Sequence, residues 1–88
     1  MPVIVISEAS LNSEAHDAMV SVLADKMRQA PGFIAHVAGD LGEGWRVIEF
    51  WENAEAANRF FAAEIHPLIP LGVKPRRRVQ AVHNLIRR

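Results

Sequence analysis

A glycine-rich segment in the middle of the chain separates two runs of residues that favour β-strands. The segment, Gly39-Asp-Leu-Gly-Glu-Gly44, carries three glycines and an aspartate, which is the turn chemistry typical of a β-hairpin. The runs on either side, Phe33 to Ala38 and Trp45 to Trp51, are rich in β-branched and aromatic residues. We therefore expect an antiparallel pair of strands at the centre of the fold.

Helical patterns flank this hairpin on both sides. Before it, Asn12 or Ser13 can cap a segment with apolar residues at helical spacing, which ends at Pro31-Gly32. After it, Asn53 can cap a second segment whose apolar stripe continues until Pro67 and Pro70 disrupt it. The two stripes consist of Ala15, Met19, Val22, Leu23 and Met27, and of Ala57, Phe60, Phe61, Ile65 and Leu68. One helix is thus predicted on each side of the hairpin.

The two ends of the sequence have strand patterns. Val3 to Ile6 is a β-branched run, and Arg77 to Ile86 contains an alternation of side chains between two faces. The resulting order, β-α-β-β-α-β, predicts an α+β, ferredoxin-like fold, with an antiparallel sheet and two helices on one face. The run from Trp45 to Trp51 places large apolar residues on both faces, more than a monomer normally exposes. We therefore expect a homodimer whose sheets pack face to face.

Length and composition narrow the classes of protein. With 88 residues, the sequence predicts a single domain over residues 1–88. The absence of cysteine argues against disulfide frameworks, zinc ribbons and cysteine hydrolases, and favours a cytoplasmic location. No apolar run is longer than that from Val3 to Ile6, whereas a membrane helix needs ~20 residues, so no membrane span is expected.

The charges are distributed unevenly. All ten acidic residues lie within residues 1–66, while six of the ten basic residues follow, four of them in the run Lys74-Pro-Arg-Arg-Arg78. Such a run could bind nucleic acid, or it could be the solvent-exposed start of a strand whose charge is balanced by acidic residues of the same fold. Because the acidic remainder would repel phosphate, we expect ion pairs within the fold and no nucleic-acid binding.

The four histidines are the side chains that titrate nearest to neutral pH. His16 lies beside an aspartate in the first helix and is expected at the surface. His36 lies mid-strand between apolar residues, where it is either a hydrogen-bonded interior residue or a pocket group. His66 ends the second helix, where a cation is favoured. His83 lies on the more apolar face of the last strand, as a pocket ligand or a core residue.

Motifs for metals and common cofactors are missing. No two histidines have the short spacing of metal ligands, so no metal site is expected. The glycine-rich hairpin carries two acids and no lysine, so its charge is the wrong sign for binding a nucleotide. No serine lies in the glycine-framed turn that presents a catalytic nucleophile. We expect no cofactor.

One family resemblance covers nearly the whole chain. Pro31-Gly-Phe33, the hairpin, Gly44-Trp-Arg-Val-Ile-Glu-Phe-Trp-Glu52 and the following Ala54-Glu-Ala-Ala-Asn-Arg-Phe-Phe61 together resemble the antibiotic biosynthesis monooxygenase domains of the dimeric α/β-barrel superfamily. The resemblance implies a ligand pocket between helices and sheet in each subunit, and a barrel closed across the dimer. It also implies cofactor-independent oxygenation of electron-rich phenols, whose deprotonated form itself donates an electron to oxygen.

The resemblance also suggests the site residues. A base or hydrogen-bond donor would come from His83, His66 or His36, with His83 the first choice, and Arg46 would stabilise an oxyanion. The pocket would be lined by Trp51, Trp45, Phe60, Phe61 and Ile65. The chain has no tyrosine, which excludes a tyrosine-based pocket, and its first strand lacks the asparagine of the haem-degrading branch.

The function that follows is a small cofactor-independent monooxygenase acting on a small aromatic molecule, either polyketide-like or another flat phenol. Two alternatives remain open. One is a polyketide cyclase of the same superfamily, because His66-Pro67-Leu68 resembles a segment of that group. The other is a non-catalytic module for small-molecule binding or dimerisation.

Overall fold

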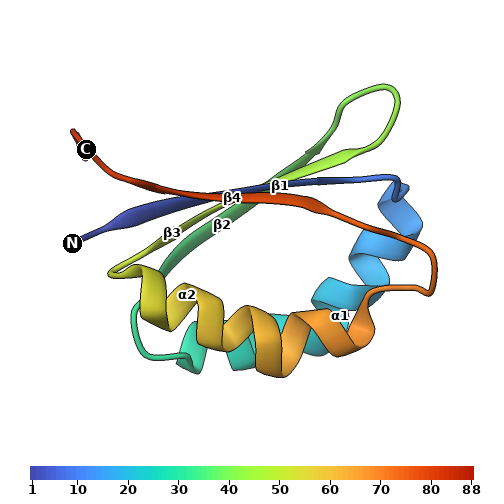
Figure 1. Ribbon diagram of the computed structural model, residues 1–88, viewed down its shortest axis with the longest axis horizontal. Coiled ribbons are helices and arrows are strands. Elements are labelled where there is room, and N and C mark those ends of the chain that lie inside the picture. Colours follow the sequence, from blue (N-terminus) through green and yellow to red (C-terminus); the bar gives the residue numbers. More distant parts are fainter.

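The computed structural model describes residues 1–88 and contains the six expected elements (Figure 1). In chain order they are β1 (Val3–Ala9), α1 (Ser13–Gln29), β2 (Phe33–Asp40), β3 (Trp45–Trp51), α2 (Ala54–Phe60) and β4 (Arg76–Ala81). The strands form one antiparallel sheet in the order β2-β3-β1-β4, and both helices lie on the same face of it. The predicted α+β, ferredoxin-like fold is confirmed. Neither helix is long and apolar enough to cross a membrane.

Both predicted helix caps are present. The Asn12 side chain accepts a hydrogen bond from the backbone N–H of Ala15, and that of Asn53 accepts one from Ala56, each at 2.8 Å. Between α1 and β2 the chain turns at Gly32, whose φ is +86° and where a Cβ would lie 2.9 Å from the Cβ of Ala56. Glycine is required there because both the backbone conformation and the contact with α2 exclude a side chain.

The alternation of β3 decides which side chains face the helices. Trp51 is paired with Val3 of β1 and Phe33 of β2, and its ring packs 5.4 Å from Phe33 and 5.5 Å from Phe60. Around it lies the buried core, which consists of Val3, Val5, Leu23, Met27, Trp51, Ala57 and Phe60. The core therefore occupies the end of the helix-covered face at which β1 begins and β3 ends.

The helix α2 does not continue regularly toward Pro67. A π-helical turn at Phe61–Ile65 and a 3₁₀ turn at His66–Leu68 follow it. Leu68, which the helical pattern placed on the buried stripe, is exposed, and its neighbour Ile69 lines a cavity instead. The prediction for Leu68 is wrong because the wider π turn shifts the stripe by one residue.

The last strand is shorter than the predicted run to Ile86. Its only neighbour is β1, and Ala81 is already paired with Val3, the first residue of that strand. The backbone N–H of Val82 bonds to the carbonyl of Pro2 at 2.9 Å, and no strand partner remains beyond it. His83 consequently lies outside the sheet and is exposed.

The face of the sheet away from the helices is apolar in the middle and charged at one end. Ile4, Ile48 and Phe50 on this face are half-buried, and Val37 is 55% exposed. At the end nearer the hairpin, the Glu8 carboxylate pairs with Arg46 at 2.7 Å and with Arg76 at 3.2 Å. The hydrogen bond from Arg46 and the nearby positive charges lower the pKa of Glu8. Of the basic run, Arg76 thus meets an acid of the fold, as expected.

Candidate functional site

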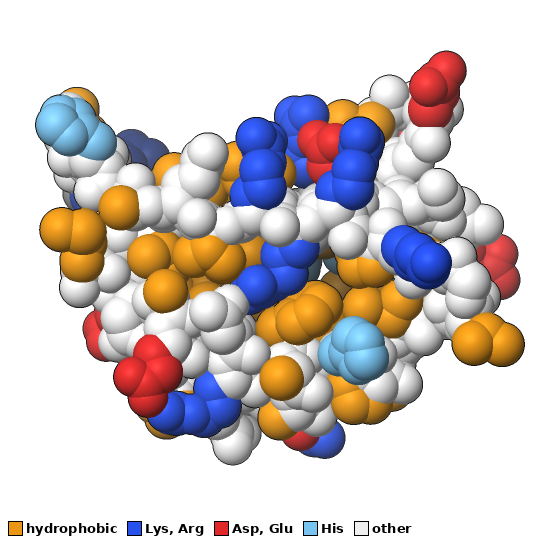
Figure 2. Space-filling model, viewed as in Figure 1, with side chains coloured by type: hydrophobic (Ala, Val, Ile, Leu, Met, Phe, Trp, Pro, Cys, Tyr) orange, Lys and Arg blue, Asp and Glu red, His pale blue; other side chains and the backbone are white.

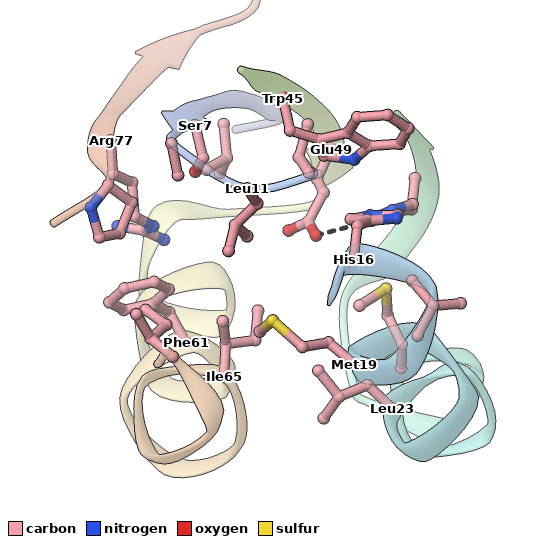
Figure 3. Close-up of a pocket in the computed structure, with 18 of the residues that line it drawn as sticks. Ser7, Leu11, His16, Met19, Leu23, Trp45, Glu49, Phe61, Ile65 and Arg77 are labelled. Atoms are coloured by element: carbon pink, nitrogen blue, oxygen red, sulfur yellow. Dashed lines mark hydrogen bonds and ion pairs between the residues drawn. The ribbon is translucent and has the colours of Figure 1, made fainter. Parts of the chain in front are cut away.

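A cavity of about 450 Å³ lies between the sheet and the two helices, beside the core. Its walls are mostly hydrophobic, with Leu11, Met19 and Ile65 among the side chains that surround it in Figure 3. Figure 2 shows a hollow on this side of the molecule, bordered by hydrophobic and basic side chains. A cavity of this size and character is typical of sites for small organic molecules.

Glu49 of β3 is the buried acid of this cavity, with an exposed fraction of 6%. One of its carboxylate oxygens accepts a hydrogen bond from Nε1 of Trp51 at 3.0 Å, and the other lies 2.9 Å from Nδ1 of His36 (dashed line in Figure 3). Burying a carboxylate is costly unless its oxygens are bonded, and these two contacts meet that need. Since a carboxylate only accepts, Nδ1 of His36 carries a proton, and in the neutral form of the ring Nε2 carries a lone pair.

His16 enters the same end of the cavity from α1 and is 9% exposed. Its ring is stacked on that of His36 at 5.7 Å and tilted against that of Trp45 at 5.0 Å. Its Nδ1 lies 3.5 Å from the carboxylate of Asp17, which is too long for a strong hydrogen bond. Burial lowers the pKa of His16, although Asp17 raises it in part, so that this imidazole is neutral at pH 7.

Four buried nitrogen atoms in this cluster have no hydrogen-bond partner in the protein. They are Nδ1 and Nε2 of His16, Nε2 of His36 and Nε1 of Trp45. An unsatisfied buried polar atom typically costs about 1–3 kcal/mol, and native proteins contain few of them. Because the unpartnered atoms belong to three side chains that line one cavity, they offer hydrogen bonds to a bound molecule.

The opposite side of the cavity is formed by Arg77 of β4 and Phe61 (Figure 3). The guanidinium carbon lies 4.5 Å from the centre of the Phe61 ring, and Nη1 donates to Oδ1 of Asn58 at 2.8 Å. Burial lowers the pKa of Arg77, while the charge of Glu49 raises it. Arginine stays charged in proteins, so this side of the cavity is cationic.

Four of the predicted site residues line this cavity: His36, Trp45, Phe61 and Ile65. Trp51 and Phe60 lie next to it in the core, without belonging to its lining.

The other three predicted polar residues lie elsewhere. Arg46 projects from the opposite face of the sheet toward Glu8. His66 is exposed on the 3₁₀ turn, with its ring 6.1 Å from that of Phe61. His83 follows β4 and is exposed. The expectation that His83 faces the cavity is therefore corrected, because the strand that would have placed it there ends two residues earlier.

Sequence reasoning missed His16, Glu49 and Arg77. The signals were present in two cases: His16 precedes Leu23 by seven residues and so shares its helix face, and Glu49 alternates with Trp45 and Trp51 on one face of β3. His16 was instead assigned to the surface because of its acidic neighbour. No group of three or more side chains of His, Asp or Glu is arranged to hold a metal ion.

Solved structures share this fold over nearly its whole length. SnoaB, a cofactor-independent oxygenase from Streptomyces nogalater, superimposes with a TM-score of 0.74 at 13% identity, over 97% of this chain and 96% of SnoaB. A candidate antibiotic biosynthesis monooxygenase from Deinococcus radiodurans gives 0.72 at 21% identity, over 97% of this chain and 96% of its own. A candidate monooxygenase from Shewanella loihica PV-4 gives 0.60 at 18% identity, over 96% of each chain.

The expected resemblance to antibiotic biosynthesis monooxygenases is thereby confirmed at the level of the fold. No protein-family model matches this sequence, and no curated protein matches it either.

Proposed function

We propose that this chain, which has the fold of cofactor-independent oxygenases, is itself a small monooxygenase that binds a flat phenolic compound in the cavity. The observation that carries the proposal is the His36–Glu49 pair. A buried carboxylate fixes one ring nitrogen of the histidine, and the other nitrogen is unpartnered at the wall of an apolar cavity. This arrangement suits a general base.

The proposed reaction begins when Nε2 of His36 removes a proton from the substrate. The negative charge of Glu49 stabilises the imidazolium that forms, and the apolar walls limit access of water to the carbanion. The carbanion then transfers electrons to O₂. For a ring CH₂ that becomes C=O, the carbon loses four electrons, one oxygen atom enters the product, and the other leaves as water with the two hydrogens of the CH₂. The electrons balance without a further reductant.

Two neighbours complete the proposed site. Nε1–H of Trp45 is a free donor for an oxyanion, and neutral His16 can accept or donate a hydrogen bond through an unpartnered nitrogen. Arg46 does not take the oxyanion role expected from the sequence, because it faces the other side of the sheet.

Turnover of anthrone, a flat ketone with an acidic ring CH₂, tests the proposal through oxygen uptake. We expect His36→Gln to lower kcat by about 10²–10⁴-fold, the usual contribution of a general base, while anthrone still binds. Glu49→Gln should also lower kcat, because it removes the charge that stabilises the imidazolium. The matched control, His66→Gln, changes an exposed histidine outside the cavity and should leave turnover unchanged.

The outcomes separate the competing functions. Turnover that survives in His36→Gln contradicts the assignment of the base. Binding of flat phenols with no oxygen uptake by the wild-type protein favours a non-catalytic module. Ring closure of a polyketide-like compound without oxygen uptake favours the cyclase.

We also propose that the open face of the sheet forms a homodimer, as the fold resemblance implies. The support is its apolar centre, in which Ile48 is half-buried by its own subunit and has no helix above it. Sedimentation should give the mass of two subunits at micromolar concentration. Ile48→Asp should yield monomers, because an unpaired carboxylate would be buried in the interface. Leu71→Asp adds the same charge at a fully exposed loop position and should remain dimeric; a monomeric wild-type protein would contradict the proposal.

A further inference from the structure

Arg77 differs from every other basic side chain of the molecule. It is the only lysine or arginine that is not exposed. Several of the exposed ones are paired with carboxylates, such as Lys26 with Glu64 and Arg46 with Glu8. No carboxylate lies within ion-pair distance of Arg77. A partly buried cation without an anion is unfavourable, since its loss of hydration is not offset.

The guanidinium is nevertheless held firmly in place. It lies on the face of Phe61 from the π turn, and one of its nitrogens donates to Asn58 of α2. The π turn and α2 thus fix its plane at the cavity wall, and four of its five N–H groups take no part in the hydrogen bond to Asn58. Planar donor pairs of this kind match the two oxygens of a carboxylate.

The acid of the cavity does not complete this site. Both oxygens of Glu49 are already bonded, one to Trp51 and the other to His36. Its charge acts on Arg77 from a distance without forming an ion pair. The cationic side of the cavity, at Arg77 (Figure 3), thus lacks an anionic partner within the protein, while the side with His36 has an unpartnered ring nitrogen.

We propose that Arg77 binds a carboxylate of the substrate, so that the substrate is an elongated aromatic acid with its reacting hydroxyl or carbon at the opposite end. The carboxylate lies against Arg77 and the aromatic rings cross the apolar middle of the cavity near Leu11. The far end then meets His36 and Trp45. The assignment of the reacting end rests on the proposed function, but the carboxylate site does not.

A set of matched probes tests this substrate class by calorimetry. The probes are 6-hydroxy-2-naphthoate, which has a hydroxyl and a carboxylate at opposite ends, its uncharged amide, and 2-naphthol, which lacks the second group. We expect the wild-type protein to bind the carboxylate at least about tenfold more tightly than the amide, as a charge-assisted pair would provide. Arg77→Met should abolish this preference and leave 2-naphthol binding nearly unchanged.

Two further variants guard against a structural explanation. Arg77→Lys keeps the charge but loses the planar donor pair, so it should retain only part of the preference. Arg78→Met removes the neighbouring charge on the other face of β4 and should have no effect. The wild-type comparison of acid with amide needs no variant, so it stands even if Arg77→Met fails to fold.

Equal affinity of the wild-type protein for the acid and the amide overturns the carboxylate site, and so does failure to bind either. The proposed function is judged separately: if anthrone turnover depends on His36 while the acid has no advantage, the oxygenase proposal stands and the Arg77 proposal falls. If the acid is preferred through Arg77 but His36→Gln turns over anthrone normally, the reverse holds.

Discussion

The two tryptophans of β3 lie on the same face of the same strand, yet their surroundings are opposite. Trp51 is 1% exposed, packs between Phe33 and Phe60, and donates its N–H to Glu49. Trp45, six residues earlier, borders the cavity, contacts His16, and leaves its N–H without a partner. At the Trp51 end of the strand the indole is packed in the core and its N–H is hydrogen-bonded, whereas at the Trp45 end the indole borders the cavity and its N–H has no partner.

This difference indicates that stability and binding are separated along a single strand. The satisfied polar group and the aromatic packing lie around Trp51, whereas the unsatisfied nitrogens gather around Trp45. Glu49 joins the two regions, because one of its oxygens serves the core tryptophan and the other serves His36 of the cavity. Substitutions at the two ends should therefore affect different properties.

The largest effect on stability is expected from Trp51→Ala. Removing a fully buried indole should lower the free energy of unfolding by about 3–5 kcal/mol, and it also leaves one Glu49 oxygen unbonded. Urea denaturation followed by circular dichroism measures the loss. Trp45→Ala is the matched comparison and should cost clearly less; equal losses would contradict the division between a packed and an open end.

His16→Leu should change stability by an intermediate amount, and it should stabilise the protein where Trp51→Ala destabilises it. It removes two unpartnered buried nitrogens, so we expect a gain of about 1 kcal/mol in the free energy of unfolding at pH 7. Stacking of His16 on His36 would be lost, so binding of 2-naphthol should weaken at the same time. A stable variant with unchanged binding would show that His16 is not part of the site.

The pH dependence of the same variant gives an independent measure. Because burial lowers the pKa of His16 below its ordinary value of 6.5, the folded protein binds this proton less readily than the unfolded chain. The contribution of His16 titration to the free energy of unfolding is therefore fully present above pH 6.5, and it is lost as the pH falls toward the lowered pKa. The contact with Asp17 opposes this decline, and the charge of His36 adds to it. His16→Leu should therefore lose less stability between pH 7 and 5 than the wild type, whereas His66→Leu, at an exposed position, should not.

The smallest effect on stability is expected from Trp45→Phe. No bond within the protein is lost with the indole N–H, so the free energy of unfolding should change by less than about 0.5–1 kcal/mol. Binding of an oxyanion, such as the phenolate of 6-hydroxy-2-naphthoate above pH 9, should weaken. A large loss of stability would mean that this indole belongs to the core.

The order of elements and the helix caps could be predicted from the sequence because they depend on local signals. The glycines of the hairpin, the asparagines at positions 12 and 53, and the alternation of β3 each act within a few residues. Part of the cavity lining could be predicted by the same means, since His36 lies mid-strand and Trp45 shares a face with Trp51.

The errors arose where the outcome depends on a distant partner. His83 lies in a run that alternates well, but β4 can only be as long as β1, its neighbour across some 75 residues of sequence. Arg77 was read as part of a charged run, and only its position beside Phe61 and Asn58 distinguishes it from Arg76 and Arg78. Pairing of Glu49 with His36 likewise depends on the register between β2 and β3.

The π turn after α2 has an evolutionary consequence. Each residue of a helix turns the chain by about 100°, and a π turn is equivalent to one inserted residue. Ile65 follows Phe61 by four residues and would face inward on a regular helix too, but beyond it the register differs: Ile69 lines the cavity, Leu68 is exposed and Glu64 pairs with Lys26. A single inserted codon therefore suffices to change which residue after Ile65 faces the cavity, and relatives with a regular helix should align to this segment with a one-residue gap.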